Sequence, residues 1–500
     1  MTLSFRPLLL AFIVALGLPL RAAERPNVIL IIGDDISWDD FGCYGNTSAR
    51  TPNIDRLAAN GIRFTNAFLT ASSCSPSRSS IVTGRYPHNN GAASELHRPI
   101  AWNIPRFPAR LREQGYYTLL SGKNHMSQDK PPAGQSAPPE PFEVIDAGQV
   151  PGNHGGHGKW EKHLQDRPRD RPFFFWFASL DAHRAWEADK EWDEKTLGPK
   201  HDPANVRVPA FLVDDAATRA DLASHANEVT RLDDYVGRVV AELERQQILH
   251  NTLIFVLADN GRPFPRAKTR LHDSGMKTAL VAHWPAGIKQ PGKTRDGLAS
   301  VIDLAPTILE SASAKKPESL QGRSLQPMFA DPSARVRRYA FSEHNWHDYA
   351  AHGRAVRDGE YLYISNLMPD QPWQGPADAV RSPSFLALLS AREQKKLTVA
   401  QADVFLAPRP KEELYRTADD PSQLKNLAND PQHATALRRL RDVLGKWREE
   451  TGDSLAADPS RDGFHRETGE RLFTGRDTSY YRTPSGADRN AATVNRPGPF

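Results

Sequence analysis

Continuous apolar runs predict that the chain is built on buried β-strands. The runs at 27–33, 173–180 and 252–258 contain few polar residues and are rich in β-branched and aromatic side chains. A short run without alternation is typical of a strand that is covered on both faces of a parallel sheet. A weaker run at 117–121 has the same character. The pattern therefore predicts an α/β fold.

Segments with helical spacing of apolar residues lie between these strands. The longest, 216–247, predicts one amphipathic helix with a stripe that faces the core. Shorter helices are predicted at 51–61, between a polar start and a glycine, and at about 105–114. The stripe of the long helix consists of Leu222, Val229, Leu232, Val236, Val239, Val240 and Leu243.

Residues 126–170 interrupt this order. They are rich in Pro, Gly, His and charged residues and have little periodicity, which indicates a long surface loop at the rim of a site. His154 and His157 could indicate a metal site, but no Cys or acidic residue has a suitable spacing to them. A loop without a metal is therefore favoured.

A polar, proline-containing stretch at 314–336 marks a predicted domain boundary. We expect a larger domain over 24–330 and a smaller α+β unit over 331–450 with an antiparallel sheet. Strands are predicted near 338–343, 353–357 and 360–365, with a hairpin connection at 357–360, and helices near 386–394 and 432–450. The polar tail over 451–500 is expected to be extended or partly disordered.

Residues 1–23 have the pattern of a secretory signal peptide. Arg6 precedes an apolar run from Leu8 to Leu20, and the small residues Ala22 and Ala23 follow it. The run is short for a membrane span, so we expect a secreted or periplasmic protein without a stable span. An N-terminal membrane anchor is the alternative.

Composition narrows the classes of function. A length of 500 residues allows roughly two to four domains. The net charge of +4 is mild, and no basic run with interleaved aromatic residues occurs, so nucleic acid is not an expected partner. The two cysteines, Cys43 and Cys74, give no disulfide framework, and Cys43 is interpreted as a packed thiol.

Oxygen ligands follow two of the predicted strands. Asp34 and Asp35 come directly after the run at 27–33, and Asp259 and Asn260 come after the run at 252–258. Open α/β sheets bind ligands at the carboxyl ends of their strands. Adjacent carboxylates repel each other unless a cation lies between them, and such hard ligands favour Ca²⁺ or Mg²⁺. The sequence therefore predicts a metal site, with a solvated turn as the alternative.

The stretch at 70–85 places a thiol on a short polar loop that enters a helix. Pro76 suits the first helical turn, and the free N–H groups at a helix start favour an anion beside Cys74. Arg78 would lie about one turn along, close enough to contact that anion. This combination favours transfer of a sulfate-like or phosphate-like group. A buried structural cysteine remains the alternative.

Further polar residues follow the other strands. Lys123 and His125 are alternate residues after the strand at 117–121, so both point one way and suit anion binding and proton transfer. His183 follows the strand at 173–180. The alternative for Lys123 and His125 is a pair of exposed polar residues after a strand. The alternative for His183 is a capping or surface histidine.

The segment Cys74-Ser-Pro-Ser-Arg78, with Thr83-Gly84-Arg85, resembles the signature of the type I sulfatases. The resemblance covers about residues 25–450. It implies the alkaline-phosphatase-like sulfatase fold, a large mixed sheet sandwiched by helices. It also implies that a maturation enzyme oxidises Cys74 to formylglycine (3-oxoalanine), whose hydrated aldehyde is the nucleophile.

The same resemblance implies roles for the other residues. Asp34, Asp35, Asp259 and Asn260 would bind Ca²⁺, with position 74 or the substrate completing the site. Arg78, Lys123 and Lys268 would hold the sulfate. His183 or Lys268 would protonate the leaving group, and His125 would assist sulfate release.

The segment 259–268, with Pro-Phe-Pro before a basic residue, narrows the resemblance to the heparan N-sulfatases and related bacterial sulfatases. Lys268 stands where the lysosomal enzyme has arginine. His97, His344 and His347 are candidate sugar ligands, with ordinary surface polarity as the alternative. We therefore expect a sulfatase that acts on glycosaminoglycan or other polysaccharide fragments, most like an N-sulfoglucosamine sulfohydrolase. The alternatives are an O-sulfatase on another sulfated polysaccharide, a phosphoester or phosphonate hydrolase, and a glycan-binding protein without turnover.

Overall fold

The computed structural model describes residues 25–500. The predicted signal peptide at 1–23 lies outside this range. Within it, none of the helices is both long and apolar enough to cross a lipid bilayer.

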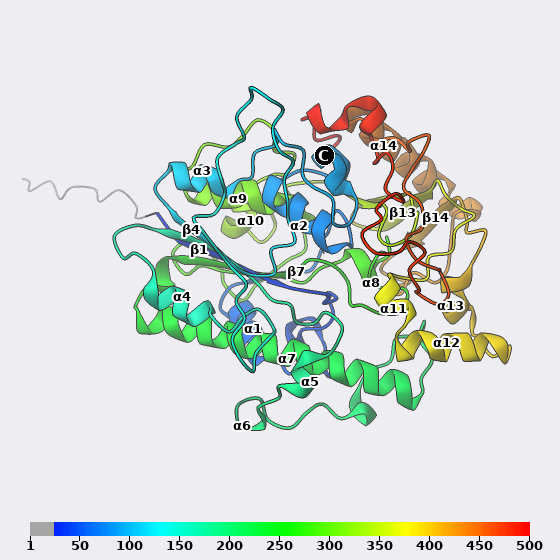
Figure 1. The fold of residues 1–500 in the computed structure, drawn as a ribbon, viewed down its shortest axis with the longest axis horizontal. Helices are drawn as coiled ribbons and strands as arrows, with labels where there is room; N and C mark the ends of the chain where they lie inside the picture. The colour runs from blue at the N-terminus through cyan, green and yellow to red at the C-terminus, as the bar shows by residue number, and fades with distance from the viewer. Residues whose placement is uncertain (1–24) are drawn as a thin grey trace, which may run out of the picture.

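A large mixed sheet forms the centre of the molecule (Figure 1). β1 is flanked by β6 and β7, and all three are parallel, as is β4 beyond β6. The prediction that the four apolar runs form strands is therefore confirmed. β8 pairs antiparallel with β7, which makes the sheet mixed. In order across the sheet the strands are β5 (Val144–Asp146), β4 (Tyr117–Gly122), β6 (Phe173–Ala178), β1 (Asn27–Gly33), β7 (Thr252–Ala258), β8 (Leu280–His283), β2 (Ile62–Phe64) and β9 (Thr294–Arg295).

Helices cover both faces of this sheet, which explains why its central strands are apolar throughout. Ile29 and Ile31 of β1 pack into one core, whereas Val28, Leu30 and Ile32 pack into the other. The first face is covered by α1 (Pro52–Ala59), α4 (Trp160–Asp166) and α7 (Ala216–Arg245), and the second by α2 (Cys74–Thr83), α3 (Pro108–Glu113), α9 (Leu304–Ser311) and α10 (Gln326–Ala330).

The apolar stripe of α7 divides between two cores. From Val229 onward it packs beneath β1, as predicted. Leu222 instead packs with Phe264 and with Phe385 of α12 (Pro383–Glu393), because the first turns of α7 lie against the C-terminal part of the chain. In Figure 1, α7 runs along the lower side of the sheet as far as α12.

The C-terminal part contains an antiparallel sheet, as predicted, but with four strands where three were expected. β12 (Gly353–Arg357) and β13 (Tyr361–Asn366) form the expected hairpin, and β11 (Ala340–His344) pairs on the other side of β12. β14 (Glu412–Arg416) was not predicted. α14 (Ala434–Thr451) packs on this sheet through Leu440, Leu444 and Trp447.

The C-terminal sheet contacts residues 69–71, which lie shortly before Cys74 in the chain. The Glu343 N–H of β11 donates to the Thr70 carbonyl at 2.7 Å, and the Ser342 hydroxyl donates to the Leu69 carbonyl at 2.7 Å. A parallel bridge between Ala71 and Glu343 extends this contact. The C-terminal sheet therefore supports the segment that leads into α2.

The region 126–170 is more ordered than a surface loop. It contains β5 at the sheet edge and α4, whose Trp160 is fully buried and stacks on Phe177. The prediction of a long loop is therefore wrong for these two elements. An isolated tryptophan in a polar stretch carries no periodic signal, so the sequence pattern did not reveal it.

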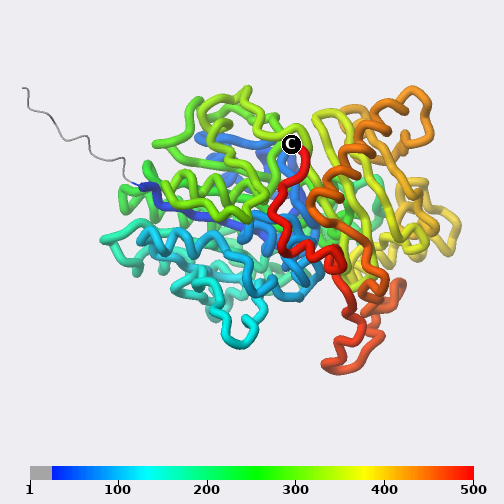
Figure 2. Tube along the Cα trace, turned by 90° about the horizontal axis from the view of Figure 1, so that it is seen from above, coloured from blue at the N-terminus to red at the C-terminus, as the bar shows by residue number. Residues whose placement is uncertain are grey.

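Residues 451–500 lack long helices or strands but pack back onto the body of the molecule. Figure 2 shows the last stretch of this segment, in red, lying between the N-terminal and C-terminal parts of the chain, whereas a red-orange stretch before it projects at the lower right. The buried Arg85 holds it, donating to the carbonyls of Ala492 and Val494 at 3.1 and 2.9 Å and to Asn495 Oδ1 at 2.6 Å. Polar contacts therefore anchor the tail to the body of the molecule.

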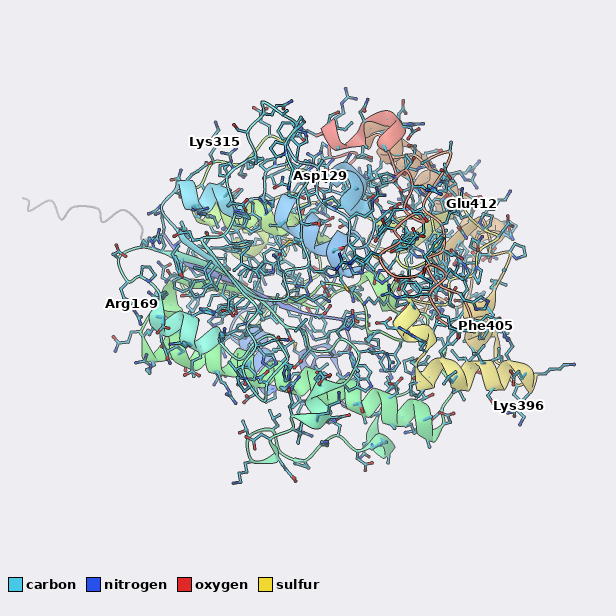
Figure 3. All side chains as sticks on the ribbon, viewed as in Figure 1. Asp129, Arg169, Lys315, Lys396, Phe405 and Glu412 are labelled. Atoms are coloured by element: carbon cyan, nitrogen blue, oxygen red, sulfur yellow. The ribbon has the colours of Figure 1, made fainter. Side chains whose placement is uncertain are left out.

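Charged side chains are spread over the outside of the molecule. Arg169, Lys315 and Lys396, labelled in Figure 3, are exposed and lie on separate parts of its outline.

The remaining α-helices of the described chain are short: α5 (Glu187–Lys190), α6 (Glu194–Leu197), α8 (Asp273–Met276), α11 (Ala377–Val380) and α13 (Val399–Ala402). A small two-stranded sheet joins β3 (Ala67–Phe68) to β10 (Ala299–Ser300).

Arg85→Ala is expected to destabilise the protein by about 2–4 kcal/mol, because it leaves several buried carbonyls without a donor. Arg110→Ala is the matched control, since Arg110 pairs only with Glu113 at the surface and should cost less than about 0.5 kcal/mol. Thermal melts and limited proteolysis of the tail check this. Equal melting temperatures for both variants would contradict the anchoring role.

Candidate active site

The carboxyl ends of the central strands bring most of the predicted site residues together. Asp34 and Asp35 follow β1, and Asp259 and Asn260 follow the neighbouring β7. All four side chains are buried. Asp35 has a left-handed backbone (φ 57°), and its N–H donates to Asp259 Oδ1 at 3.4 Å. The two loops therefore form one cluster of oxygen atoms.

Cys74 is the first residue of α2 and lies beside this cluster. Its Sγ is 3.9 Å from Asp35 Oδ1, and its side chain is only 2% exposed. Burial raises the pKa of the Cys74 thiol well above its usual range, and the positive charges of Lys123 and Lys268 do not offset it. A thiolate is therefore disfavoured here, so the unmodified cysteine is a poor nucleophile.

Arg78 lies one turn further along α2 and contacts several groups of the site. Its Nε donates to Asp259 Oδ2 at 2.7 Å and its Nη1 donates to the Lys123 carbonyl at 3.0 Å. Its Nη2 is 3.7 Å from Asp34 Oδ1. The planar guanidinium can bridge these partners because its donors have a fixed fork geometry.

Two lysines complete the cationic side of the site. Lys123 Nζ donates to Asp34 Oδ2, and Lys268 Nζ lies 2.7 Å from Asp35 Oδ1. Burial alone would raise the pKa of Asp34, but the charges of Lys123, His183, Arg78 and Lys268 outweigh it and hold this pKa well below its usual range. Burial raises the pKa of Asp259 to about 7 despite the contact with Arg78.

The oxygen cluster fits a divalent cation. Asp34 Oδ1 and Asn260 Oδ1 are buried, and neither has a hydrogen-bond partner among residues 25–500. Single ligand atoms of Asp34, Asp35 and Cys74 lie within 4.8 Å of one another. Buried oxygens without donors are unfavourable, and carboxylate and amide oxygens are preferred ligands of Ca²⁺.

The predicted histidines occupy two sides of the site. His125 Nε2 lies 2.7 Å from His97 Nδ1, and the His97 N–H donates to Ser75 Oγ at 2.8 Å. Burial, together with the charges of Lys123 and His97, lowers the pKa of His125 to about 2, so its imidazole is neutral near neutral pH. His183 Nε2 lies 3.9 Å from Asp35 Oδ2, on another side.

His344 and His347 differ from each other. His347 is buried near the site, with its Nδ1 2.6 Å from the hydroxyl of Ser73, the residue before Cys74. His344 packs edge-on against Trp373, and burial and nearby arginines lower its pKa to about 3. His344 lines a small cavity together with Ser73 and His347, so its role as a sugar ligand stays a prediction.

A cleft of about 450 Å³ opens beside Lys123 and His183. The region 126–170 contributes Gln149 and His154 to its wall. His154 contacts Glu191, whereas His157 is buried with its Nε2 2.8 Å from Asp181 Oδ2. The two histidines thus have separate carboxylate partners and do not form one metal site.

Asp378 is a site residue that the sequence did not reveal. It comes from the short helix α11, far along the chain, and its Oδ2 is 3.8 Å from His183 Nε2. No motif marks it, because it lies in a polar stretch without strand or helix periodicity.

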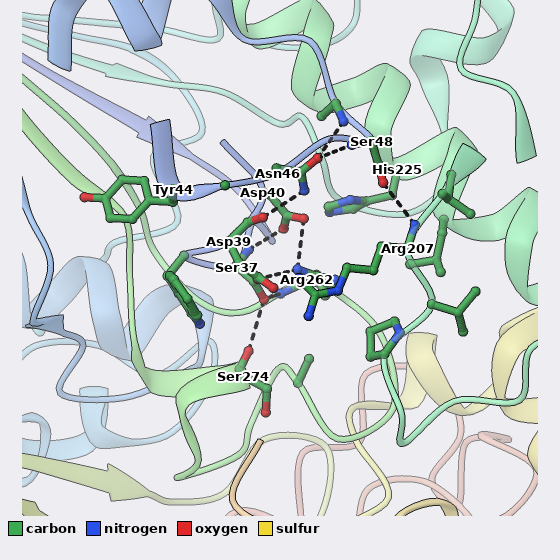
Figure 4. Close-up of a pocket in the computed structure, with 18 of the residues that line it drawn as sticks. Ser37, Asp39, Asp40, Tyr44, Asn46, Ser48, Arg207, His225, Arg262 and Ser274 are labelled. Carbon is green, nitrogen blue, oxygen red and sulfur yellow. Dashed lines mark hydrogen bonds and ion pairs between the residues drawn. The ribbon is translucent and has the colours of Figure 1, made fainter. Parts of the chain in front are cut away.

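A second cavity of about 420 Å³ is lined by residues that follow the two oxygen-bearing loops, among them Ser37 and Arg262 (Figure 4). Ser37 joins the loops, since the Arg262 N–H donates to its Oγ at 3.0 Å and its own N–H donates to Asp40 Oδ2 at 2.7 Å. His225 of α7 lies in the wall, with its Nε2 3.0 Å from the Asp35 carbonyl. The wall of this cavity therefore contacts the backbone of Asp35, one residue of the oxygen cluster.

Two regions of this chain match models of known protein families. The family model described as Sulfatase matches residues 26–143 and 158–314. The model described as N-sulphoglucosamine sulphohydrolase, C-terminal, matches residues 266–397.

Individual proteins are also similar to this chain over most of its length. Human N-sulphoglucosamine sulphohydrolase is 31% identical over 485 residues, covering 91% of this chain and 95% of that protein. An ulvan-active sulfatase from Formosa agariphila is 29% identical over 489 residues, covering 87% and 76%. A protein solved in complex with its substrate D-glucosamine-2-N,6-O-disulfate has a TM-score of 0.62 at 18% identity, covering 85% and 98%, which supports the fold.

Arg78 can be tested by two substitutions. Arg78→Met should destabilise the protein by about 3–5 kcal/mol, because it leaves buried carboxylates without their cation. Arg78→Lys should cost less, since it keeps the charge but loses the fork. Thermal melts measure both, with the exposed Arg56→Lys as control. Wild-type stability of Arg78→Met would be incompatible with this role.

Proposed function

Since the chain belongs to the sulfatase family, we propose that it hydrolyses sulfate groups of sulfated carbohydrates, with N-sulfated glucosamine as the favoured substrate. The observation that carries this proposal is the placement of Cys74 at the start of α2, beside the oxygen cluster and Arg78. The match of residues 266–397 to a C-terminal region described for N-sulphoglucosamine sulphohydrolase supports the N-sulfated substrate.

Two groups outside the unmodified chain belong to this proposal. Asp34, Asp35, Asp259 and Asn260 would hold Ca²⁺, which supplies positive charge to the nucleophile and the sulfate. Conversion of Cys74 to formylglycine by a maturation enzyme would supply a geminal diol, one hydroxyl to attack sulfur and the other to release sulfate by elimination. The buried, neutral thiol supports the need for conversion, because it is poorly activated as a nucleophile.

The cationic side chains would bind the sulfate. Arg78, Lys123 and Lys268 lie around Cys74, and each is buried or nearly so. Positive charges in a site from which water is excluded stabilise the negative charge on the oxygens of a group in transfer. Their present contacts with Asp34, Asp35 and Asp259 keep them oriented toward position 74.

The histidines would move protons. Burial keeps His125 neutral, and its Nδ1 has no hydrogen-bond partner within the described chain, so it can accept a proton during sulfate release. His183 is half-buried at the mouth of the cleft and would contact the leaving group. Lys268, which also contacts Asp35, is the alternative donor of this proton.

The proposed division of the chain follows from these positions. Residues 24–330 would form the catalytic domain, because they supply Cys74, the oxygen cluster and the cations. Residues 331–450 would form a subdomain that shapes the substrate cleft through Asp378 and His347. The pattern at 1–23 supports export to the periplasm or the exterior, where polysaccharides are degraded.

An O-sulfated polysaccharide is the second candidate substrate. The similarity to an ulvan-active sulfatase favours it, as does Lys268 in place of the arginine of the lysosomal N-sulfatase. Lysine offers a point charge where arginine offers a planar fork, so the two residues need not prefer the same sulfate.

The activity can be tested by ion chromatography of released sulfate. Protein made together with a formylglycine-generating enzyme should release sulfate from N-sulfoglucosamine and from an aryl sulfate, and little phosphate from an aryl phosphate. Cys74→Ala should lower sulfate release by about 1,000-fold or more, because the nucleophile is lost. Cys43→Ala is the matched control and should remain active. A strong preference for the phosphate ester would overturn the proposal.

The metal site can be tested separately. Chelation should lower both the melting temperature and sulfate release, and Ca²⁺ should restore them. Asn260→Ala should raise the Ca²⁺ concentration needed for half-maximal stabilisation by at least about 10-fold, since it removes an oxygen ligand. Asn205→Ala, at an exposed position, should not change it. A melting temperature unaffected by chelator and by Ca²⁺ would argue against a bound cation.

A further inference from the structure

Asp378 places a carboxylate at the mouth of the catalytic cleft. Its Oδ2 lies 3.8 Å from His183 Nε2, and that same nitrogen lies 3.9 Å from Asp35 Oδ2. Single ligand atoms of the three residues lie within 4.8 Å of one another, so the two carboxylates are neighbours. The Ala379 N–H donates to Asp378 Oδ1 at 2.7 Å, which fixes the orientation of the carboxylate. His183 therefore faces two neighbouring carboxylates, of which only Asp35 belongs to the oxygen cluster.

Asp378 differs from the other carboxylates of the site. Asp34, Asp35 and Asp259 each contact a lysine or arginine within the site. Asp378 has a side chain that is 23% exposed, and its Oδ2 contacts the half-buried His183. Burial would raise its pKa, but the charges of Lys268, His183 and Arg184 outweigh it and lower this pKa, so the carboxylate is ionised.

An ionised carboxylate can accept hydrogen bonds but cannot donate them. The nitrogen that links sulfur to the sugar in an N-sulfate carries a hydrogen and can donate. The corresponding oxygen of a sulfate ester carries no hydrogen and can only accept. A carboxylate next to the leaving atom therefore favours the N-sulfate and disfavours the ester.

The products differ in the same sense. Water cleaves the S–N bond to give an ammonium group and sulfate, with both protons of water retained on nitrogen. Water cleaves the S–O bond to give an alcohol, sulfate and a free proton. The ammonium product carries a positive charge that a neighbouring carboxylate stabilises, whereas the alcohol does not.

We propose that Asp378 is a specificity-determining residue that accepts a hydrogen bond from the leaving nitrogen of an N-sulfated amino sugar. This inference rests on the proposed function, since it assumes that His183 faces the leaving group. Asp378 lies in the C-terminal part of the chain. The C-terminal part would therefore contact the leaving group, whereas residues at the carboxyl ends of the central strands would bind the sulfate.

The test compares two substrates in one set of variants. The kcat/KM values for N-sulfoglucosamine and for glucosamine 6-O-sulfate are measured for the wild type, Asp378→Asn, Asp378→Glu and the exposed control Asp370→Asn. Asp378→Asn should lower the ratio of N- to O-sulfate hydrolysis by about 10- to 100-fold, the size of one charge-assisted hydrogen bond. Asp378→Glu should recover part of the ratio, and Asp370→Asn should leave it unchanged.

The other outcomes contradict either the role of Asp378 or the proposed function. Equal losses on both substrates would make Asp378 a residue that only supports the site, and an unchanged ratio would remove it from recognition. Wild-type activity on the O-sulfate alone would overturn the role of Asp378 and leave the sulfatase proposal intact. Failure of the wild type on every sulfated substrate would instead overturn the proposed function itself. Should Asp378→Asn fail to fold, the ratio for Asp378→Glu decides, because it moves the carboxylate without removing it.

Discussion

The site depends on the electrostatic cost of crowding buried carboxylates. Asp34, Asp35 and Asp259 lie together at the ends of two neighbouring parallel strands, and none of the three is exposed. Buried like charges are unfavourable unless cations and donors compensate them. Arg78, Lys123 and Lys268 supply that compensation from three other segments. The same cations that stabilise the folded site are thereby positioned around Cys74, where an anionic substrate would bind.

The fold provides this arrangement through its sheet and through one contact between its two parts. β1 and β7 are adjacent and in register, so the residues that follow them meet. The C-terminal sheet pairs with the segment before α2 through Glu343 and Thr70, which fixes where the helix starts. Stability and function are therefore linked, because the packing of the C-terminal part sets the position of the proposed nucleophile.

Sequence reasoning predicted the parts of the structure that have local signals. The runs at 27–33 and 252–258 are apolar throughout because both faces of their strands are covered, so the strands and the residues that follow them could be read directly. The β14 segment has only a weak alternation of apolar and polar residues and is flanked by charged residues, so its sequence gives little sign of a strand. It forms a strand because it pairs with β13. Asp378 and the tail bound by Arg85 depend on contacts between distant segments.

The most direct test of the account is the mass of the tryptic peptide that contains position 74, measured on protein that releases sulfate. The account predicts that this peptide is lighter than the cysteine form by the mass of H₂S less that of one oxygen atom. It also predicts that the converted fraction rises in proportion to specific activity across preparations. Full sulfatase activity in protein whose Cys74 is an unmodified thiol would contradict the proposed nucleophile.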